Sequence, residues 1–243
     1  MTEDVDWMRP MSSLAIDGDR KGPMLSREHE RELLRSGLVE LDLEPHPTAI
    51  DSFLLFIDEL VRWNSKTNLI GNASRNQIIV RHILDSLTVY RLLPLKKESI
   101  LDLGAGAGFP SVPLAIVDRS LCITAVEKRR RRAAFLESVS SLLGLSGYRV
   151  VERDVRDVHE AFDVVLARAV GELHLLHTLA GNAIKEGTVI IAFKGKITEI
   201  DKEMKNLREK IKAEGEHNIR IQRVQVPHLK EEERNIVIIE MVS

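Results

Sequence analysis

The sequence predicts an α/β fold in which a doubly wound, mostly parallel sheet follows a cap of helices. Three observations lead to this expectation. Apolar residues recur at helical spacing in the first third of the chain, strand-like and helix-like segments alternate from residue 99 onward, and a glycine-rich turn follows the first predicted strand. The chain has 243 residues, 44% hydrophobic and 30% charged, which is enough to bury the core of one such domain.

The N-terminal part divides into a tail and a helical cap. Residues 1–27 mix charged residues with Gly and Pro and contain no apolar run, so we expect a tail that is not a signal peptide. Residues 28–95 are expected to form the cap. Apolar residues recur there at intervals of three and four, Pro45 and Pro47 separate the first two helices, and a third helix is expected over residues 77–92.

Residues 96–243 are expected to form the sheet domain. The strand-like segments are residues 99–103, 121–126, 148–151, 162–167 and 188–193. The helix-like segments are the stretch just after the glycine turn and residues 130–143, 173–184 and 198–213. Two last apolar segments, 219–226 and 235–241, are joined by a polar loop too short for a crossover helix, so they should pair antiparallel at one edge. The expected sheet has seven strands with an antiparallel last strand.

A glycine-rich turn points to a nucleoside cofactor. Residues 102–110 (Asp-Leu-Gly-Ala-Gly-Ala-Gly-Phe-Pro) lie where the first strand meets its helix, and Gly104 and Gly106 let the backbone approach a ligand. Glu127, at the end of the second strand, is placed to accept hydrogen bonds from ribose hydroxyls. In the alternative interpretation the glycines only permit tight packing and Glu127 caps a helix. The spacing, with Asp102 two residues before Gly104, resembles that of a Rossmann-like S-adenosylmethionine-dependent methyltransferase fold.

Charge and cysteine content limit the partners and the compartment. The net charge of −2 does not announce a nucleic-acid partner, so RNA contacts must come from local patches such as residues 128–132, five consecutive cations. A solvated helix face is the alternative for that run. No stretch approaches the roughly 20 apolar residues of a membrane span. Cys122, the single cysteine, suits a reducing cytoplasm and is expected in the core of its strand.

Further motifs follow one another in an order that resembles a known family. They are residues 63–69 (Trp-Asn-Ser-Lys-Thr-Asn-Leu), 81–86 (Arg-His-Ile-Leu-Asp-Ser), 113–116 (Pro-Leu-Ala-Ile), 168–169 (Arg-Ala) and 194–195 (Lys-Gly). From about Leu33 to its C-terminus the chain resembles the glucose-inhibited division protein B family, bacterial guanine-N7 methyltransferases of 16S ribosomal RNA. The resemblance implies S-adenosylmethionine as cofactor and 16S rRNA or the small ribosomal subunit as partner. No obligate protein partner is evident, and we expect a monomer.

The resemblance also implies roles for single residues. Gly104 and Phe109 are implied to touch the cofactor, Asp154 and Val155 to lie against its adenine, and Arg168 to face the methyl-transfer site. With Asp102, Gly106 and Glu127 these residues complete the expected cofactor site. One departure is Ser111, which stands where the family usually has glycine.

Arg168 and Lys194 are the expected catalytic residues. Each follows a predicted strand at the crevice, and a cation there is suited to hold O6 of guanine or a flanking phosphate. The nitrogen lone pair at N7 is free at neutral pH, so no general base is required, and the rate should come from alignment and electrostatics. Either residue is alternatively a surface ion-pair partner. The remaining expected RNA contacts, besides Lys194, are the cap residues Asn68 and His82 and the cations Lys128, Arg131 and Arg132.

Three other functions remain open from the residues alone. A nicotinamide-dependent oxidoreductase would use the same glycine turn but needs a second, substrate-binding domain. A non-catalytic RNA-binding protein would not need Asp102 and Glu127, and a methyltransferase with another acceptor is opposed only by the family motifs. His174 and His177 lie three residues apart on a predicted helix without further ligands, so no metal site is expected.

Overall fold

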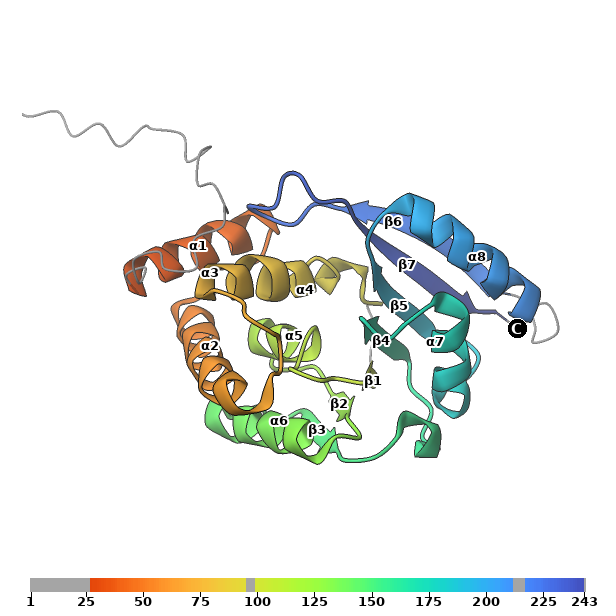
Figure 1. The fold of residues 1–243 in the computed structure, drawn as a ribbon, viewed down its shortest axis with the longest axis horizontal. Helices are drawn as coiled ribbons and strands as arrows, with labels where there is room; N and C mark the ends of the chain where they lie inside the picture. Colours follow the sequence, from red (N-terminus) through yellow and green to blue (C-terminus); the bar gives the residue numbers. More distant parts are fainter. Residues whose placement is uncertain (1–26, 95–98, 212–216, 243) are drawn as a thin grey trace, which may run out of the picture.

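A seven-stranded sheet with helices on both faces forms the centre of the computed structural model, which describes residues 27–94, 99–211 and 217–242 (Figure 1). The strands are β1 (Ile100–Leu103), β2 (Ile123–Val126), β3 (Tyr148–Val151), β4 (Val164–Arg168), β5 (Val189–Lys194), β6 (His217–Val224) and β7 (Arg234–Met241). Their order is β3-β2-β1-β4-β5-β7-β6, and β7 runs antiparallel to both of its neighbours. The predicted fold class, including the antiparallel last strand, is confirmed.

Alternation along the strands separates two apolar cores. Ile100 of β1 and Leu166 of β4 contribute to one core, and Leu101 and Val165, the residues next to them, contribute to the other. Helices α5 (Ser111–Val117) and α6 (Arg130–Leu143) cover the first face. Helices α7 (Leu173–Ala180) and α8 (Ile197–Ile211) cover the second.

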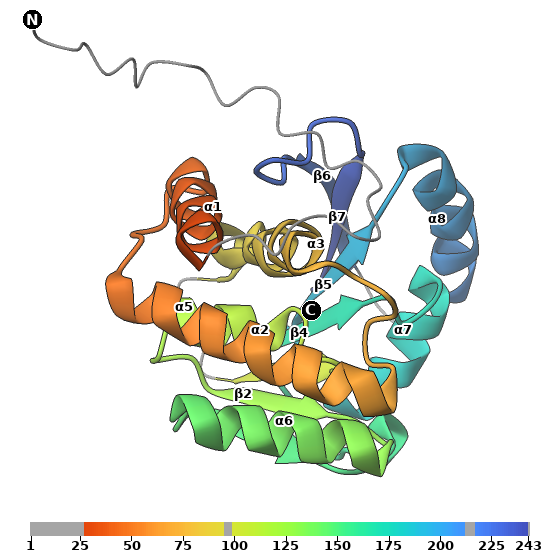
Figure 2. The same ribbon diagram turned by 60° about the vertical axis from the view of Figure 1, so that its left-hand side comes forward.

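The N-terminal helices pack over the α5 and α6 side of the sheet (Figure 2). They are α1 (Arg27–Glu40), α2 (Pro47–Thr67), α3 (Arg75–Ile78), the π-helix η1 (Ile79–Leu84), α4 (Asp85–Leu87) and the 3₁₀ turn η2 (Tyr90–Leu92). Glu59 of α2 joins the cap to α6, because its carboxylate accepts hydrogen bonds from Trp63 Nε1 at 2.7 Å and from Ser138 Oγ at 2.7 Å. The cap therefore shares one core with the sheet.

Several predicted boundaries differ from the structure. The strand expected from residue 121 begins at Ile123, so Cys122 lies before it and is exposed, and the expectation of a core cysteine is wrong. The helix expected over 173–184 ends at Ala180 and continues as the 3₁₀ turn η4 (Gly181–Ala183). Arg27 begins α1, and the rest of the predicted tail lies outside the described residues, as does the expected cap boundary at 95–96. None of the described helices is long and apolar enough to cross a membrane.

Candidate functional site

The glycine-rich turn lies between β1 and α5 at the carboxyl edge of the parallel strands. Gly106 and Gly108 have φ angles of +56° and +81°, in the left-handed region that favours glycine. A Cβ atom at Gly108 would lie 2.6 Å from Val112 Cγ2, so the turn packs tightly on α5. Gly104 begins the turn and is exposed to solvent. The turn therefore presents backbone at an accessible edge, as the sequence predicts for a ligand site.

Glu127 fixes this turn from the end of β2. Its side chain is buried, and its carboxylate accepts hydrogen bonds from Gly106 N at 3.1 Å and from Arg129 N at 2.8 Å. The second bond lies at the start of α6, so the carboxylate ties the turn to that helix. Glu127 therefore lies at the turn, as the cofactor interpretation expects, and also caps the start of α6, as the alternative expects. A buried carboxylate that accepts N–H donors is suited to a polar ligand beside it.

Asp102 lies beneath the turn and is almost completely buried. Its Oδ2 atom accepts a hydrogen bond from Ser111 Oγ, at the first residue of α5. Burial raises the pKa of Asp102 to about 6, and the bonds from Ser111 oppose that rise. The bond between Asp102 and Ser111 therefore closes the segment between them, which contains all the glycines of the turn.

Phe109 is where the turn meets the cap. Its ring stacks on His82 of η1, with centroids 5.0 Å apart and 27° between the planes, and lies 5.4 Å from the ring of Phe56 in α2. Burial first, and then the charges of Arg168 and Arg81, lower the pKa of His82 to about 4. His82 is therefore neutral at pH 7. A π-helix is uncommon and often marks a functional site, and here it carries the motif residues 81–84.

Arg168 ends β4 and points into the space between the sheet and the cap. One Nη donates to Asp85 Oδ2 at 2.8 Å and to the carbonyl of Arg81 at 2.6 Å, and the guanidinium carbon lies 5.7 Å from the centre of the Phe109 ring. The Arg168 side chain is 16% exposed and that of Asp85 is 5% exposed. This buried pair brings Arg168 together with His82 and Phe109, three of the predicted site residues.

Arg234 is a site residue that the sequence analysis missed. It begins β7, and its Nε lies 3.5 Å from the other carboxylate oxygen of Asp85. Glu232 in turn pairs with Arg234 at 2.7 Å and with Arg81 of η1. A cation at the start of a predicted last strand, next to the carboxyl end of β5, was the available signal.

Lys194 lies apart from Arg168. Arg168 pairs in register with Phe193, so Lys194 is one residue further along β5 and its side chain points to the opposite face of the sheet. There its Nζ contacts Glu203 of α8 at 2.6 Å and the carbonyl of Gly171 at 2.7 Å. The structure therefore does not bring the two expected catalytic cations together.

The expected adenine contacts lie beyond β3. Asp154 precedes the 3₁₀ turn η3 (Val155–Asp157) and accepts two hydrogen bonds from the Arg156 guanidinium, at 2.9 Å and 2.8 Å. These bonds hold the pKa of Asp154 well below its ordinary value. Val155 is half-buried, and Lys128 Nζ lies 3.7 Å from Asp154. Asp154, Val155 and Glu127 therefore share the carboxyl edge of β2 and β3.

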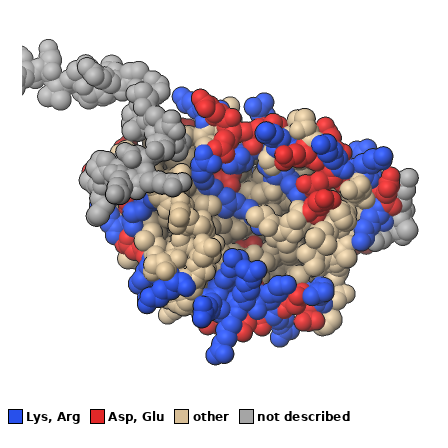
Figure 3. All heavy atoms as spheres, viewed as in Figure 1, with Lys and Arg blue, Asp and Glu red and all other residues tan. Residues whose placement is uncertain are grey.

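The run of cations at the start of α6 is exposed. Residues 128–131 are exposed and Arg132 is half-buried, close enough that a Cβ on Gly106 would lie 3.5 Å from its Nη1. Within the described ranges, only Lys128 of this run lies within ion-pair distance of a carboxylate. Figure 3 shows a dense group of Lys and Arg side chains below a hollow in an uncharged part of the surface, in the region where Figure 1 draws α6. Asn68, the αL residue that ends α2, is also exposed.

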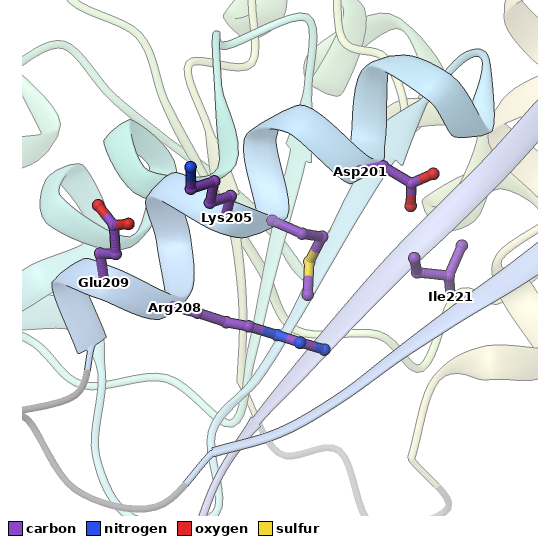
Figure 4. A pocket seen from close by; sticks show the side chains of 6 residues that line it. Asp201, Lys205, Arg208, Glu209 and Ile221 are labelled. Atoms are coloured by element: carbon purple, nitrogen blue, oxygen red, sulfur yellow. The ribbon is translucent and has the colours of Figure 1, made fainter.

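A separate groove lies between α8 and β6 (Figure 4). It contains none of the predicted site residues. Its two cations, Lys205 and Arg208, lie on α8, which covers the face of the sheet opposite to the cap. We call it the α8 groove. Its cations provide a control for the cations of residues 128–132 at the start of α6.

Comparisons with known proteins relate this chain to a family of proteins. Residues 49–237 match the family described as rRNA small subunit methyltransferase G. The protein of that name from Bacillus subtilis (strain 168) is 31% identical over 219 residues, which cover 87% of this chain and 90% of the relative. The one from Brevibacillus brevis (strain 47 / JCM 6285 / NBRC 100599) is 36% identical over 201 residues, which cover 79% of this chain and 83% of the relative.

Solved structures share the fold at low sequence identity. The O-methyltransferase from Bacillus cereus in complex with SAH has a TM-score of 0.51 at 18% identity, covering 76% of this chain and 90% of that chain. TYW2 of M. jannaschii in complex with AdoMet has a TM-score of 0.50 at 17% identity, covering 65% of this chain and 77% of that chain. Both resemblances concern the fold.

Proposed function

The chain belongs to the rRNA small subunit methyltransferase G family, and on that premise we propose that it methylates N7 of one loop guanine in 16S rRNA. The methyl donor is S-adenosylmethionine. The observation that supports the proposal best is the glycine turn, closed by buried Glu127 and Asp102, directly beside the Arg168–Asp85 pair. An rRNA substrate places the reaction in the cytoplasm, and we propose that the protein acts as a monomer.

The residues at the carboxyl edge fit a nucleoside cofactor. Backbone approach is possible at Gly104 and Gly106 because neither carries a side chain, and the Glu127 carboxylate is an acceptor of the kind that ribose hydroxyls need. We propose that Asp154 and Val155 contact the adenine, and that Asp102 and Phe109 complete the site. The bound cofactor supplies a methyl group on a sulfonium, and the protein supplies position and charge.

Arg168 is the residue we propose to hold the acceptor base. Its guanidinium has a fixed fork of donors, lies between the turn and the cap, and is kept in place by Asp85. N7 of guanine carries a free lone pair, so the reaction needs alignment rather than a proton acceptor. His82 is neutral and stacked on Phe109, which suits a residue that shapes the site rather than one that transfers protons.

We propose that the RNA backbone enters over the start of α6. Of the cations proposed to contact RNA there, Lys128 and Arg131 are exposed and the half-buried Arg132 borders the glycine turn, and neutralised phosphates are the main source of affinity for such a surface. Asn68 is proposed to contact the RNA from the cap. Lys194 is proposed to contact O6 or a phosphate, which requires its ammonium to leave Glu203.

Transfer of a labelled methyl group tests this function. The purified protein is incubated with labelled S-adenosylmethionine and either unmodified small-subunit RNA or large-subunit RNA. We expect label in the small-subunit RNA alone, a loss of about 100-fold or more with Arg168→Ala, and a loss with Lys194→Gln that Glu203→Gln does not reproduce. Binding of the cofactor without any transfer to RNA would refute the acceptor. Wild-type transfer by Lys194→Gln would refute the role of that side chain.

A further inference from the structure

We propose that Tyr148 and Ser111 are positioning residues for the cofactor site: a relay of two buried hydroxyls, from β3 through α5, sets the Asp102 carboxylate and with it the glycine turn. The inference rests on the proposed cofactor site and extends it to two side chains that touch neither the turn's open edge nor the acceptor side.

The three groups form one directed chain of hydrogen bonds. Ser111 Oγ donates to Asp102 Oδ2, because the carboxylate has no proton to give when it is ionised. Ser111 Oγ also lies 2.8 Å from Tyr148 OH. Since the single serine hydroxyl hydrogen is used toward Asp102, Tyr148 is the donor in this second bond. The exposed fractions are 6% for Tyr148, 0% for Ser111 and 1% for Asp102, so water does not substitute for either hydroxyl.

The sheet register explains how Tyr148 on β3 reaches α5, the helix that follows β1. Tyr148 pairs with Ile123, which pairs with Ile100, so these side chains share the face that also carries Asp102. The register partner of Asp102 on β2 is Ala125, which presents only a methyl group. That small side chain lets the tyrosine ring extend across β2 to the first residue of α5.

The bond between Asp102 and Ser111 acts on the turn because these two residues flank it. Asp102 is two residues before Gly104, and Ser111 directly follows Pro110, so their bond closes the whole glycine segment. Substituting Ser111 removes a donor to the buried carboxylate, a bond that is stronger than a neutral one, and substituting Tyr148 removes the donor that orients the Ser111 hydroxyl. The turn should then sample geometries that bind the cofactor less well.

The pH dependence of cofactor binding reports on the protonation of Asp102. A relay with a purely structural role would leave that pH dependence unchanged. Burial raises the pKa of Asp102 to about 6, and the donors from Ser111 counter this effect. The ionisable groups that act on Asp102 are Tyr148 from β3, Arg168 from β4 and Glu127 after β2. Removal of the relay leaves burial less opposed, so the pKa of Asp102 rises further, and cofactor affinity is lost at higher pH than in the unaltered protein.

The experiment measures binding of S-adenosylhomocysteine by calorimetry between pH 5.5 and 8. The variants are Tyr148→Phe, which removes only the distal hydroxyl, and Ser111→Ala. The control is Tyr90→Phe, since Tyr90 OH donates to Asp118 at 3.1 Å at the other end of α5. We expect affinity to fall about fivefold to tenfold in Tyr148→Phe and further in Ser111→Ala, with the acid limb of binding moved to higher pH in both, and no change in the control.

Two results would overturn the proposal, and they are distinguishable. In the first, both variants bind with the affinity and pH dependence of the unaltered protein and show only a lower melting temperature, as Tyr90→Phe also would. That result would mean that the relay only stabilises the core. Failure of the unaltered protein to bind S-adenosylhomocysteine would instead refute the cofactor site itself, and the inference with it. Circular dichroism identifies any variant that does not fold, and Tyr148→Phe keeps the ring, so it provides the decisive comparison.

Discussion

Alanine substitutions at three glycines can separate backbone strain, steric overlap and the role of the proposed cofactor turn. The three glycines have similar φ angles but different surroundings. Gly144, which ends α6, has φ +60° and no atom within 4 Å of a built Cβ. Gly106 has φ +56° and only ordinary contacts, 3.5 Å to Arg132 and 3.6 Å to the carbonyl of Gly104. Gly108 has φ +81°, with Val112 Cγ2 at 2.6 Å and Leu136 Cδ2 at 3.2 Å.

The expected costs of alanine follow from these distances. At Gly144 the substitution carries only the left-handed backbone cost, about 1 kcal/mol after the gain from a stiffer unfolded chain. Gly106→Ala should cost the same. At Gly108 the new methyl overlaps two buried side chains, which adds about 1–3 kcal/mol of overpacking. Gly108→Ala is therefore expected to lower the free energy of unfolding by about 2–4 kcal/mol in total.

Urea unfolding of the three variants, with S-adenosylhomocysteine affinity measured in parallel, checks this reasoning. Gly106→Ala should match Gly144→Ala in stability but bind the ligand at least tenfold more weakly, because its new methyl group would occupy space in which the proposed cofactor approaches the backbone of the turn. Gly144→Ala should bind normally. Equal stabilities for Gly108→Ala and Gly144→Ala would refute the packing argument, and normal affinity in Gly106→Ala would refute the role of the turn.

Three further outcomes are expected. Arg168→Ala leaves a buried carboxylate with one partner fewer and should lower the free energy of unfolding by about 3 kcal/mol in urea titrations; an unchanged midpoint would contradict the buried pair. His82 has a pKa of about 4 when folded and about 6.5 when unfolded, so the unfolded state takes up a proton first as pH falls. The His82 contribution to the free energy of unfolding should therefore drop by up to about 3 kcal/mol between pH 6.5 and 4, against the opposite contribution of Asp102, and subtracting the pH profile of His82→Asn from that of the unaltered protein should isolate it. The double variant Lys128→Gln with Arg131→Gln should weaken RNA binding and reduce its salt slope by about 1.5, whereas the same change at the two α8-groove cations, also one lysine and one arginine, should not; equal effects would exclude the α6 surface.

The fold and the position of the glycine turn could be predicted because their signals are local. Strand periodicity, the glycine spacing and the position of Glu127 each depend on a few neighbouring residues, and the structure has the turn between β1 and α5 as expected. The polar loop between the last two strands was also sufficient to predict their antiparallel pairing. These features need no knowledge of contacts between distant segments.

The rest depends on pleat, register and long-range contacts, which a single sequence does not specify. Arg168 and Lys194 both end strands, but the one-residue offset in register sends them to opposite faces of the sheet. The approach of Arg234 to Asp85 joins the cap to the start of β7, two segments that lie far apart in the sequence. Cys122 was misplaced because strand propensity does not mark the first paired residue, and β2 begins one residue later.

We propose that the turn, Arg168 and the α6 cations together direct one methyl group to one guanine nitrogen. The most direct test of this proposal maps the product: unmodified small-subunit RNA or subunits are treated with the protein and labelled S-adenosylmethionine, and N7-methylguanine is located by reduction and aniline cleavage. We expect a single cleavage site at a loop guanine, carrying all of the label. Label at another atom or on another base, or no label despite measurable cofactor binding, would contradict it.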